Sequence, residues 1–195
     1  MLIRREVLAW AGGYRGGIVG AEDYDLWLRI ADRYRLANLG EVVVNYRIHP
    51  NQVSMRKREQ QTLSKLAAKT SAHLRRSGKP DPLNEPIPIT PETLAAMGVT
   101  QSEQQSELAT DYRHWVRTMR LAGEDNIALQ AALEFVHSDF PHVERWQIAD
   151  LYLTIAQIFW KQKQYAQSMG ALVHAVVARP LVIGHPLKTL LRRLG

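Results

Sequence analysis

Three carboxylates at the start of one apolar pattern constrain the fold of this chain most strongly. Glu22, Asp23 and Asp25 follow directly after Gly20 and Ala21. Apolar side chains then recur at the spacing of one helix face, at Trp27, Ile30, Ala31 and Tyr34. This combination predicts an amphipathic helix over residues 22–34 that begins with an acidic turn.

The three acids have two different interpretations. Acids in a first helical turn are common because they meet unpaired backbone N–H groups and the positive end of the helix dipole. A capping role is therefore the simpler interpretation. Asp23 stands one turn before Trp27, so we expect its carboxylate at the inward edge of the helix start, whereas Glu22 and Asp25 should point elsewhere. That position would suit a general base.

Two further segments flank the acidic helix. The chain before it reads Ile3-Arg4-Arg5-Glu6-Val7-Leu8 and then Gly12-Gly13-Tyr14-Arg15, which predicts a short helix over residues 3–11 that is ended by the two glycines. The chain after it reads Glu41-Val42-Val43-Val44-Asn45-Tyr46-Arg47-Ile48-His49-Pro50-Asn51-Gln52-Val53-Ser54. In this order and spacing, residues 2–54 closely resemble the second half of the catalytic domain of family 2 inverting glycosyltransferases, which have the GT-A fold.

The resemblance implies a fold for the first part of the chain. Residues 1–55 would be the C-terminal, acceptor-side part of a GT-A catalytic domain, with two helices and a two-strand hairpin. The hairpin is predicted over residues 35–39 and 41–48, with Gly40 at the turn, because β-branched residues favour extended backbone. The whole chain is thus predicted to be mostly α, with a partial α/β segment followed by a helical, repeat-like domain.

The resemblance also implies roles for individual residues. Asp23 would be the general base, and Glu22 would bind the acceptor or a neighbouring cation. The residues implied on the acceptor side are Gly12, Gly13, Tyr14 and Trp27. The residues implied at the donor diphosphate are Arg47, His49 and Ser54, and His49 could also complete a metal site.

A complete enzyme of this kind would transfer a sugar, with inversion, from a nucleotide-sugar donor to a saccharide or lipid-linked acceptor. It would need a divalent cation, Mg2+ or Mn2+, held by an Asp-x-Asp motif. No Asp-x-Asp precedes Gly20, and the aspartates of Asp23-Tyr24-Asp25 diverge by about 200° on a helix and cannot share one ion. We therefore expect a fragment that lacks the nucleotide-binding half, holds no cation alone and is inactive in isolation.

The remainder of the chain is predicted to be helical. Residues 56–78 form a charged amphipathic pattern that predicts a connecting helix. Residues 79–90 contain four prolines and no periodicity, which predicts a linker. Residues 91–195 predict a helical domain, with a helix start at Thr90-Pro91 and two helical pairs, over residues 101–121 and 125–137 and over residues 143–161 and 165–178.

The second helical pair resembles a tetratricopeptide repeat. The matching positions are Ile155, Ala156, Phe159, Tyr165, Ser168, Ala175 and Pro180. The first pair fits only loosely, through Gly123, Ala128 and Phe135. Since an independent solenoid needs about three repeats, we expect a small tetratricopeptide-like domain. Such a domain leaves open an alternative function, a non-enzymatic module for protein interaction.

Charge and composition limit the remaining classes. The net charge of +6 is spread along the chain and mixed with acids, and no zinc-finger, helix-turn-helix or RNA-binding motif is present, so we expect no nucleic-acid partner. Residues 186–194 pattern as a short basic amphipathic helix, which would either cap the helical domain or lie on an anionic membrane surface. No signal peptide or membrane span is evident, so a cytoplasmic location is expected, with the inner membrane face as the alternative.

Overall fold

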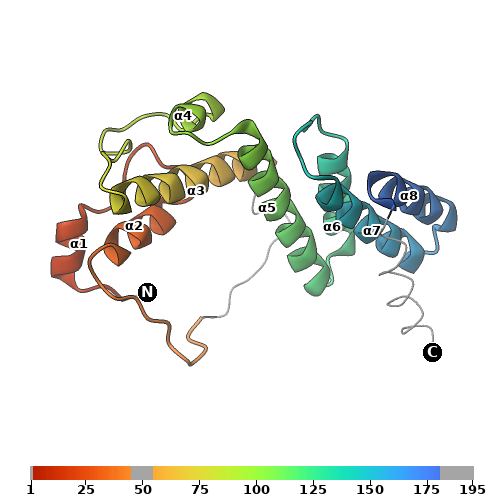
Figure 1. The fold of residues 1–195 in the computed structure, drawn as a ribbon. Coiled ribbons are helices and arrows are strands. Elements are labelled where there is room, and N and C mark those ends of the chain that lie inside the picture. Colours follow the sequence, from red (N-terminus) through yellow and green to blue (C-terminus); the bar gives the residue numbers. More distant parts are fainter. Residues whose placement is uncertain (1, 45–54, 181–195) are drawn as a thin grey trace. The chain divides into compact units, whose positions relative to one another are not determined.

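The computed structural model describes residues 2–44 and 55–180 (Figure 1). The described residues form eight helices and no β-strand. They divide into two compact units, Met1–Gln104 and Gln105–Gly195. No helix of the described part has the length and apolar character needed to cross a bilayer.

The first unit contains the acidic helix. Its elements are α1 (Arg5–Ala11), α2 (Glu22–Ala31), α3 (Met55–Arg76) and α4 (Pro91–Ala96). As predicted, α1 ends at Gly12, whose φ of 74° closes the helix in the left-handed region that glycine adopts at little cost. The predicted start of α4 is also confirmed, with Thr90 as N-cap and Pro91 in the first turn.

Two apolar clusters stabilise this unit, and α2 contacts both α1 and α3 (Figure 1). The smaller cluster joins Val7 of α1 to Leu26 and Ile30 of α2. The larger one includes Ile18, Ala21, Leu66, Ala67, Leu83, Ile89, Leu94 and Val99. Leu83 and Ile89 are each only 4% exposed, so the proline-rich segment expected as a linker over 79–90 packs into the first unit.

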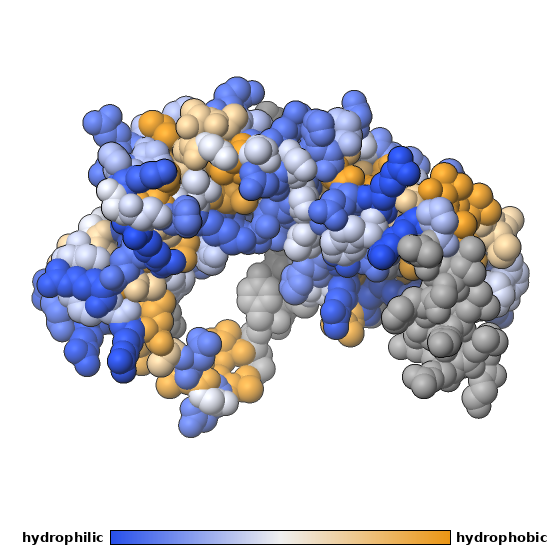
Figure 2. Space-filling view, in the orientation of Figure 1, coloured by the Kyte–Doolittle hydropathy of each residue, from blue (hydrophilic) through white to orange (hydrophobic). Residues whose placement is uncertain are grey.

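The predicted hairpin is wrong over its described residues. Residues 35–44 follow α2 without regular secondary structure, and residues 45–48 of the second predicted strand lie outside the described residues. The five large apolar side chains of this segment, Leu36, Leu39, Val42, Val43 and Val44, are all at least 50% exposed. Figure 2 shows apolar side chains at the bottom of the view, over the segment that follows α2. The partial GT-A α/β segment is therefore not formed by the described residues. Strand propensity depends on packing against neighbouring strands, and a lone hairpin is marginal in water.

The second unit contains the two helical pairs expected from the sequence. The pairs are α5 (Gln101–Leu121), which belongs to this unit from Gln105 on, with α6 (Asp125–Val136), and α7 (Arg145–Lys161) with α8 (Tyr165–Ala178). Tyr112 of α5 and Phe135 of α6 are both buried and their rings lie 4.8 Å apart. Between α7 and α8, the buried Ser168 hydroxyl donates to the Ala156 carbonyl oxygen at 2.8 Å. Small residues thus allow these two helices to approach closely.

Candidate functional site

The acids of α2 separate into accessible and buried groups. Asp23 is exposed, and its Oδ1 accepts the Tyr24 N–H at 2.7 Å. Glu22 is partly exposed, whereas Asp25 is fully buried. The predicted inward orientation of Asp23 is therefore wrong, because the buried stripe of α2 runs through Leu26 and Ile30 and carries Asp25 rather than Asp23 inward. An exposed carboxylate at a helix start remains able to meet a substrate hydroxyl.

Asp25 is held by an ion pair inside the unit. Arg29, four residues later on the same helix, donates from Nε to Asp25 Oδ2 at 2.9 Å. The same guanidinium donates to the carbonyl oxygens of Ala11 and Gly13, the latter at 2.6 Å. Arg29 thus fixes the end of α1 against α2 through charge-assisted hydrogen bonds. Asp25 serves this junction and is not available as a base.

The ion pair continues into a chain of alternating charges. Arg15 Nε lies 3.7 Å from Asp25 Oδ2, and Arg15 Nη2 lies 2.6 Å from Asp81 Oδ2. Asp81 in turn pairs with Arg75 of α3 at 2.9 Å. Asp32, just after α2, pairs with Arg75 and Arg76, both at 2.8 Å. This charge network connects α2, the following turn, α3 and the proline-rich segment.

Asp81 is the centre of the network. Burial alone would raise the pKa of its carboxyl, but hydrogen bonds from Arg15, the Ser71 hydroxyl, the Leu83 N–H and Arg75 outweigh burial and lower the pKa far below its usual range. The Ser71 hydroxyl donates at 2.6 Å and the Leu83 N–H at 2.9 Å. Asp81 is therefore ionised at neutral pH and orients three segments of the first unit.

The residues implied on the acceptor side lie along the α1–α2 junction. Gly12 and Gly13 both have positive φ, and the Gly13 carbonyl contacts Arg29, about 9 Å along the helix axis from Asp23. Tyr14 is 61% exposed. Trp27 is half-buried and packs against the cluster of Val7, Leu26 and Ile30. The two glycines thus lie beside the later turns of α2. Trp27 stabilises this helix through its contact with the apolar cluster.

The residues implied at the diphosphate, Arg47, His49 and Ser54, lie outside the described residues. Within the described part of the chain, no group of three or more His, Asp or Glu side chains could hold a metal ion. Asp25 and Asp81 are already engaged by arginines. The described residues therefore do not fit the divalent cation that the resemblance implies.

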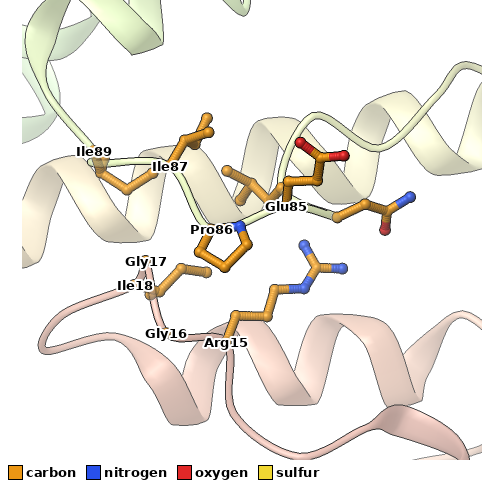
Figure 3. Close-up of a pocket in the computed structure, with 10 residues that line it drawn as sticks. Arg15, Gly16, Gly17, Ile18, Glu85, Pro86, Ile87 and Ile89 are labelled. Carbon is orange, nitrogen blue, oxygen red and sulfur yellow. The ribbon is translucent and has the colours of Figure 1, made fainter.

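A small cavity lies where the glycine-rich turn meets the proline-rich segment (Figure 3). Its volume of about 100 Å³ is enough for only a few water molecules. Arg15, Gly16, Gly17 and Ile18 face Glu85, Pro86, Ile87 and Ile89 across it. A Cβ on Gly17 would stand 2.5 Å from the Ile87 carbonyl oxygen, so the two backbones meet directly at this glycine. The glycine-rich turn is therefore closely packed against the proline-rich segment.

The sequence did not reveal the charge network. The Asp25–Arg29 spacing of four residues was a usable indication, because such pairs meet on one helix face. Nothing in the local pattern around Arg15 or Asp81 predicted that they would meet, since they are 66 residues apart.

Comparison with known proteins relates one stretch of the chain to a glycosyltransferase. Over 52 residues the chain is 44% identical to the O-antigen biosynthesis glycosyltransferase WbnJ of Escherichia coli. The aligned stretch is 25% of this chain and 20% of that protein, so the chain spans about a fifth of the relative's length. No family model and no solved structure matches the chain, and its resemblances to family 2 and to tetratricopeptide repeats stay predictions.

Proposed function

We propose that the first unit carries the acceptor-side segment of a family 2 inverting glycosyltransferase, with Asp23 as the general base. The observation that carries the proposal is the 44% identity to an O-antigen biosynthesis glycosyltransferase. We infer that this similarity falls on residues 2–54, where the glycosyltransferase motifs stand. The proposed reaction transfers a sugar from a nucleotide sugar to a saccharide or lipid-linked acceptor.

The environment of Asp23 supports its role as base. Its side chain is exposed, and no described residue forms an ion pair with it, whereas Asp25 is locked by Arg29. With Oδ1 engaged by the Tyr24 N–H, Oδ2 can accept the proton of an acceptor hydroxyl. The hydroxyl oxygen would then bond to the anomeric carbon as the nucleoside diphosphate leaves from the opposite face with the electron pair of the broken bond.

The other residues of the segment have supporting roles in this proposal. Glu22, beside the base, would hydrogen-bond the acceptor. Tyr14, at 61% exposure, offers a ring for contact with a sugar. The network from Arg29 to Asp81 would keep the start of α2 in place. Donor binding and any divalent cation belong to residues outside the described part, so we derive no catalytic step through them.

A chimeric enzyme tests the proposal. The stretch of the Escherichia coli glycosyltransferase that matches this chain would be replaced by the matching stretch of this chain, and sugar transfer would be measured with the donor and acceptor of the parent enzyme. We expect transfer to persist, because two stretches that are 44% identical should pack in the same way. A chimera that folds, as judged by circular dichroism and thermal melting, but transfers no sugar would contradict the proposal.

A further inference from the structure

A pocket in the first unit lies where three helices end. It has a volume of about 390 Å³, within the range of about 300–1,000 Å³ that is typical of small-molecule pockets. Its lining includes Ala11 at the end of α1, Asp32 directly after α2 and Arg76 at the end of α3. Asp23 and Asp32 stand nine residues apart, about 13 Å along the axis of α2. The pocket is therefore separate from the candidate base.

The charges around this pocket compensate one another. Four arginines line it, and three aspartates pair with them. The pairs are Arg15 with Asp81, Arg29 with Asp25, Arg75 with Asp32 and Asp81, and Arg76 with Asp32. The C-terminal ends of α1, α2 and α3 add partial negative charge, because the last carbonyl groups of a helix have no intrahelical partner. The pocket therefore carries little net charge.

Three side chains of the lining retain hydrogen-bonding groups for a ligand. The exposed Asn84 side chain makes no hydrogen bond with a described residue, and its amide can both donate and accept. Arg76 donates to Asp32 from Nε, so Nη1 and Nη2 remain as donors on a side chain that is 51% exposed. The indole N–H of Trp10 has no acceptor within the described part of the chain. The pocket thus offers donors and an acceptor without an unpaired charge.

Trp10 is the aromatic side chain of the pocket lining, and it is 43% exposed. The Tyr34 ring packs against it edge to face, with the ring centroids 5.4 Å apart. The Arg33 guanidinium lies over the same indole, 5.4 Å from its centroid. These two contacts hold the indole in place although it is accessible, so it can meet a ligand without losing much conformational freedom.

We propose that this pocket binds a neutral pyranose unit of a saccharide, at a site separate from the reaction centre. Sugar hydroxyls both donate and accept, so they match Asn84 and Arg76 without adding charge to a balanced lining. The C–H groups on one face of a pyranose ring are apolar and can pack on the Trp10 indole. A phosphate suits the pocket less well, because Asp32 and the three helix ends oppose its charge. The inference goes beyond the proposed transfer reaction, since saccharide binding is measured without a sugar donor.

A glycan array tests the inference on the full chain. The array carries neutral and phosphorylated hexose oligosaccharides, and the fluorescently labelled chain is applied to it. We expect binding to neutral oligosaccharides that weakens at least about tenfold in Trp10→Ala and about threefold in Asn84→Ala, which loses one neutral hydrogen bond. The matched control is Trp160→Ala, because Trp160 is 44% exposed, also packs edge to face on a tyrosine and lies in the second unit.

Several outcomes would overturn the proposal. The first is no binding of the unaltered chain to any neutral oligosaccharide, and the second is an equal loss in Trp10→Ala and Trp160→Ala. Binding only to phosphorylated oligosaccharides, with competition by inorganic phosphate, would identify an anion site instead. Asn84→Ala separates binding from folding, because the Asn84 side chain is exposed and should leave the melting temperature unchanged. Unaltered binding in that variant would also contradict the proposal.

Discussion

Arg29 donates from Nε to Asp25 Oδ2 at 2.9 Å, and the two side chains are only 9% and 1% exposed. This ion pair separates the acids at the start of α2 into a structural and an accessible group. Asp25 stabilises the packing of α1 on α2, because its partner Arg29 also donates to the carbonyl oxygens of Ala11 and Gly13. Asp23, two residues earlier, has no such partner among the described residues.

Replacement of Asp25 should therefore destabilise the first unit, whereas replacement of Asp23 should not. We expect Asp25→Ala to lower the free energy of unfolding by about 3 kcal/mol, because it leaves the Arg29 charge buried without its partner. Asp23→Ala is expected to change stability by at most about 0.5 kcal/mol. Urea denaturation followed by circular dichroism measures both, and equal losses in the two variants would contradict the assignment.

Gly17 should not tolerate a side chain. The Cβ of an alanine there would lie 2.5 Å from the Ile87 carbonyl oxygen, so the turn or the proline-rich segment must shift. We expect Gly17→Ala to cost about 1–3 kcal/mol in the free energy of unfolding. Gly16→Ala is the matched control, since a Cβ at Gly16 meets nothing within 4 Å. A thermal melt that does not distinguish the two variants would show that the segments do not meet at Gly17.

The first unit should lose stability in acid through Asp81. The folded state lowers the pKa of this carboxyl, so Asp81 contributes its stabilisation fully above the unfolded pKa, near pH 4, and loses it as the pH falls further. We expect the free energy of unfolding to fall with a slope of up to about 1.4 kcal/mol per pH unit from this group. Asp81→Asn should be less stable at neutral pH and should show a shallower acid slope. An unchanged slope in that variant would contradict the role of Asp81.

Replacing Lys163 by glycine should stabilise the folded second unit. Lys163 lies two residues after the end of α7 and has a φ of 61°, whereas the corresponding position after α5 is Gly123, with a φ of 82°. A lysine in this region is strained by its Cβ, so Lys163→Gly should raise the free energy of unfolding by about 0.5–1 kcal/mol. Gln162→Gly, at a φ of −82°, should give no gain. Differential scanning calorimetry of the two variants makes the comparison, and a lower melting temperature for Lys163→Gly would contradict it.

The full chain should bind nucleotide sugars weakly or not at all. The described residues provide no cluster for a divalent cation, and the chain spans about a fifth of its glycosyltransferase relative. Isothermal titration calorimetry with a panel of nucleotide sugars and Mn2+ measures this. Tight binding would show that the donor site does not require a further segment.

Most helices of the described residues could be predicted from the sequence, because they have a local apolar pattern and several begin or end at a recognisable residue, although α2 ends at Ala31 and not at residue 34. Gly12 closes α1 and Thr90 begins α4, both as predicted. The strands failed for the opposite reason: residues 35–44 have strand propensity, but a strand also needs a neighbour, and no described residue pairs with them. Local propensity therefore predicted the helices, but it did not predict whether two strands would pair.

The candidate site could be predicted only in part. The acidic motif was visible in the sequence, but the inward side of α2 was assigned to Asp23 although it belongs to Asp25. The rotation of a short helix depends on its partners, here Val7 and the carbonyl oxygens at the end of α1. The contact between Arg15 and Asp81 spans 66 residues and has no local pattern, so only the folded chain reveals it.

The rate of sugar transfer by the chimeric enzyme with Asp23→Asn tests the central claim most directly. We expect the rate to fall at least about a hundredfold, because the amide cannot accept the hydroxyl proton. The melting temperature should remain unchanged, because Asp23 makes no ion pair with any described residue. A variant that retains the parental rate would contradict the assignment of Asp23 as the base.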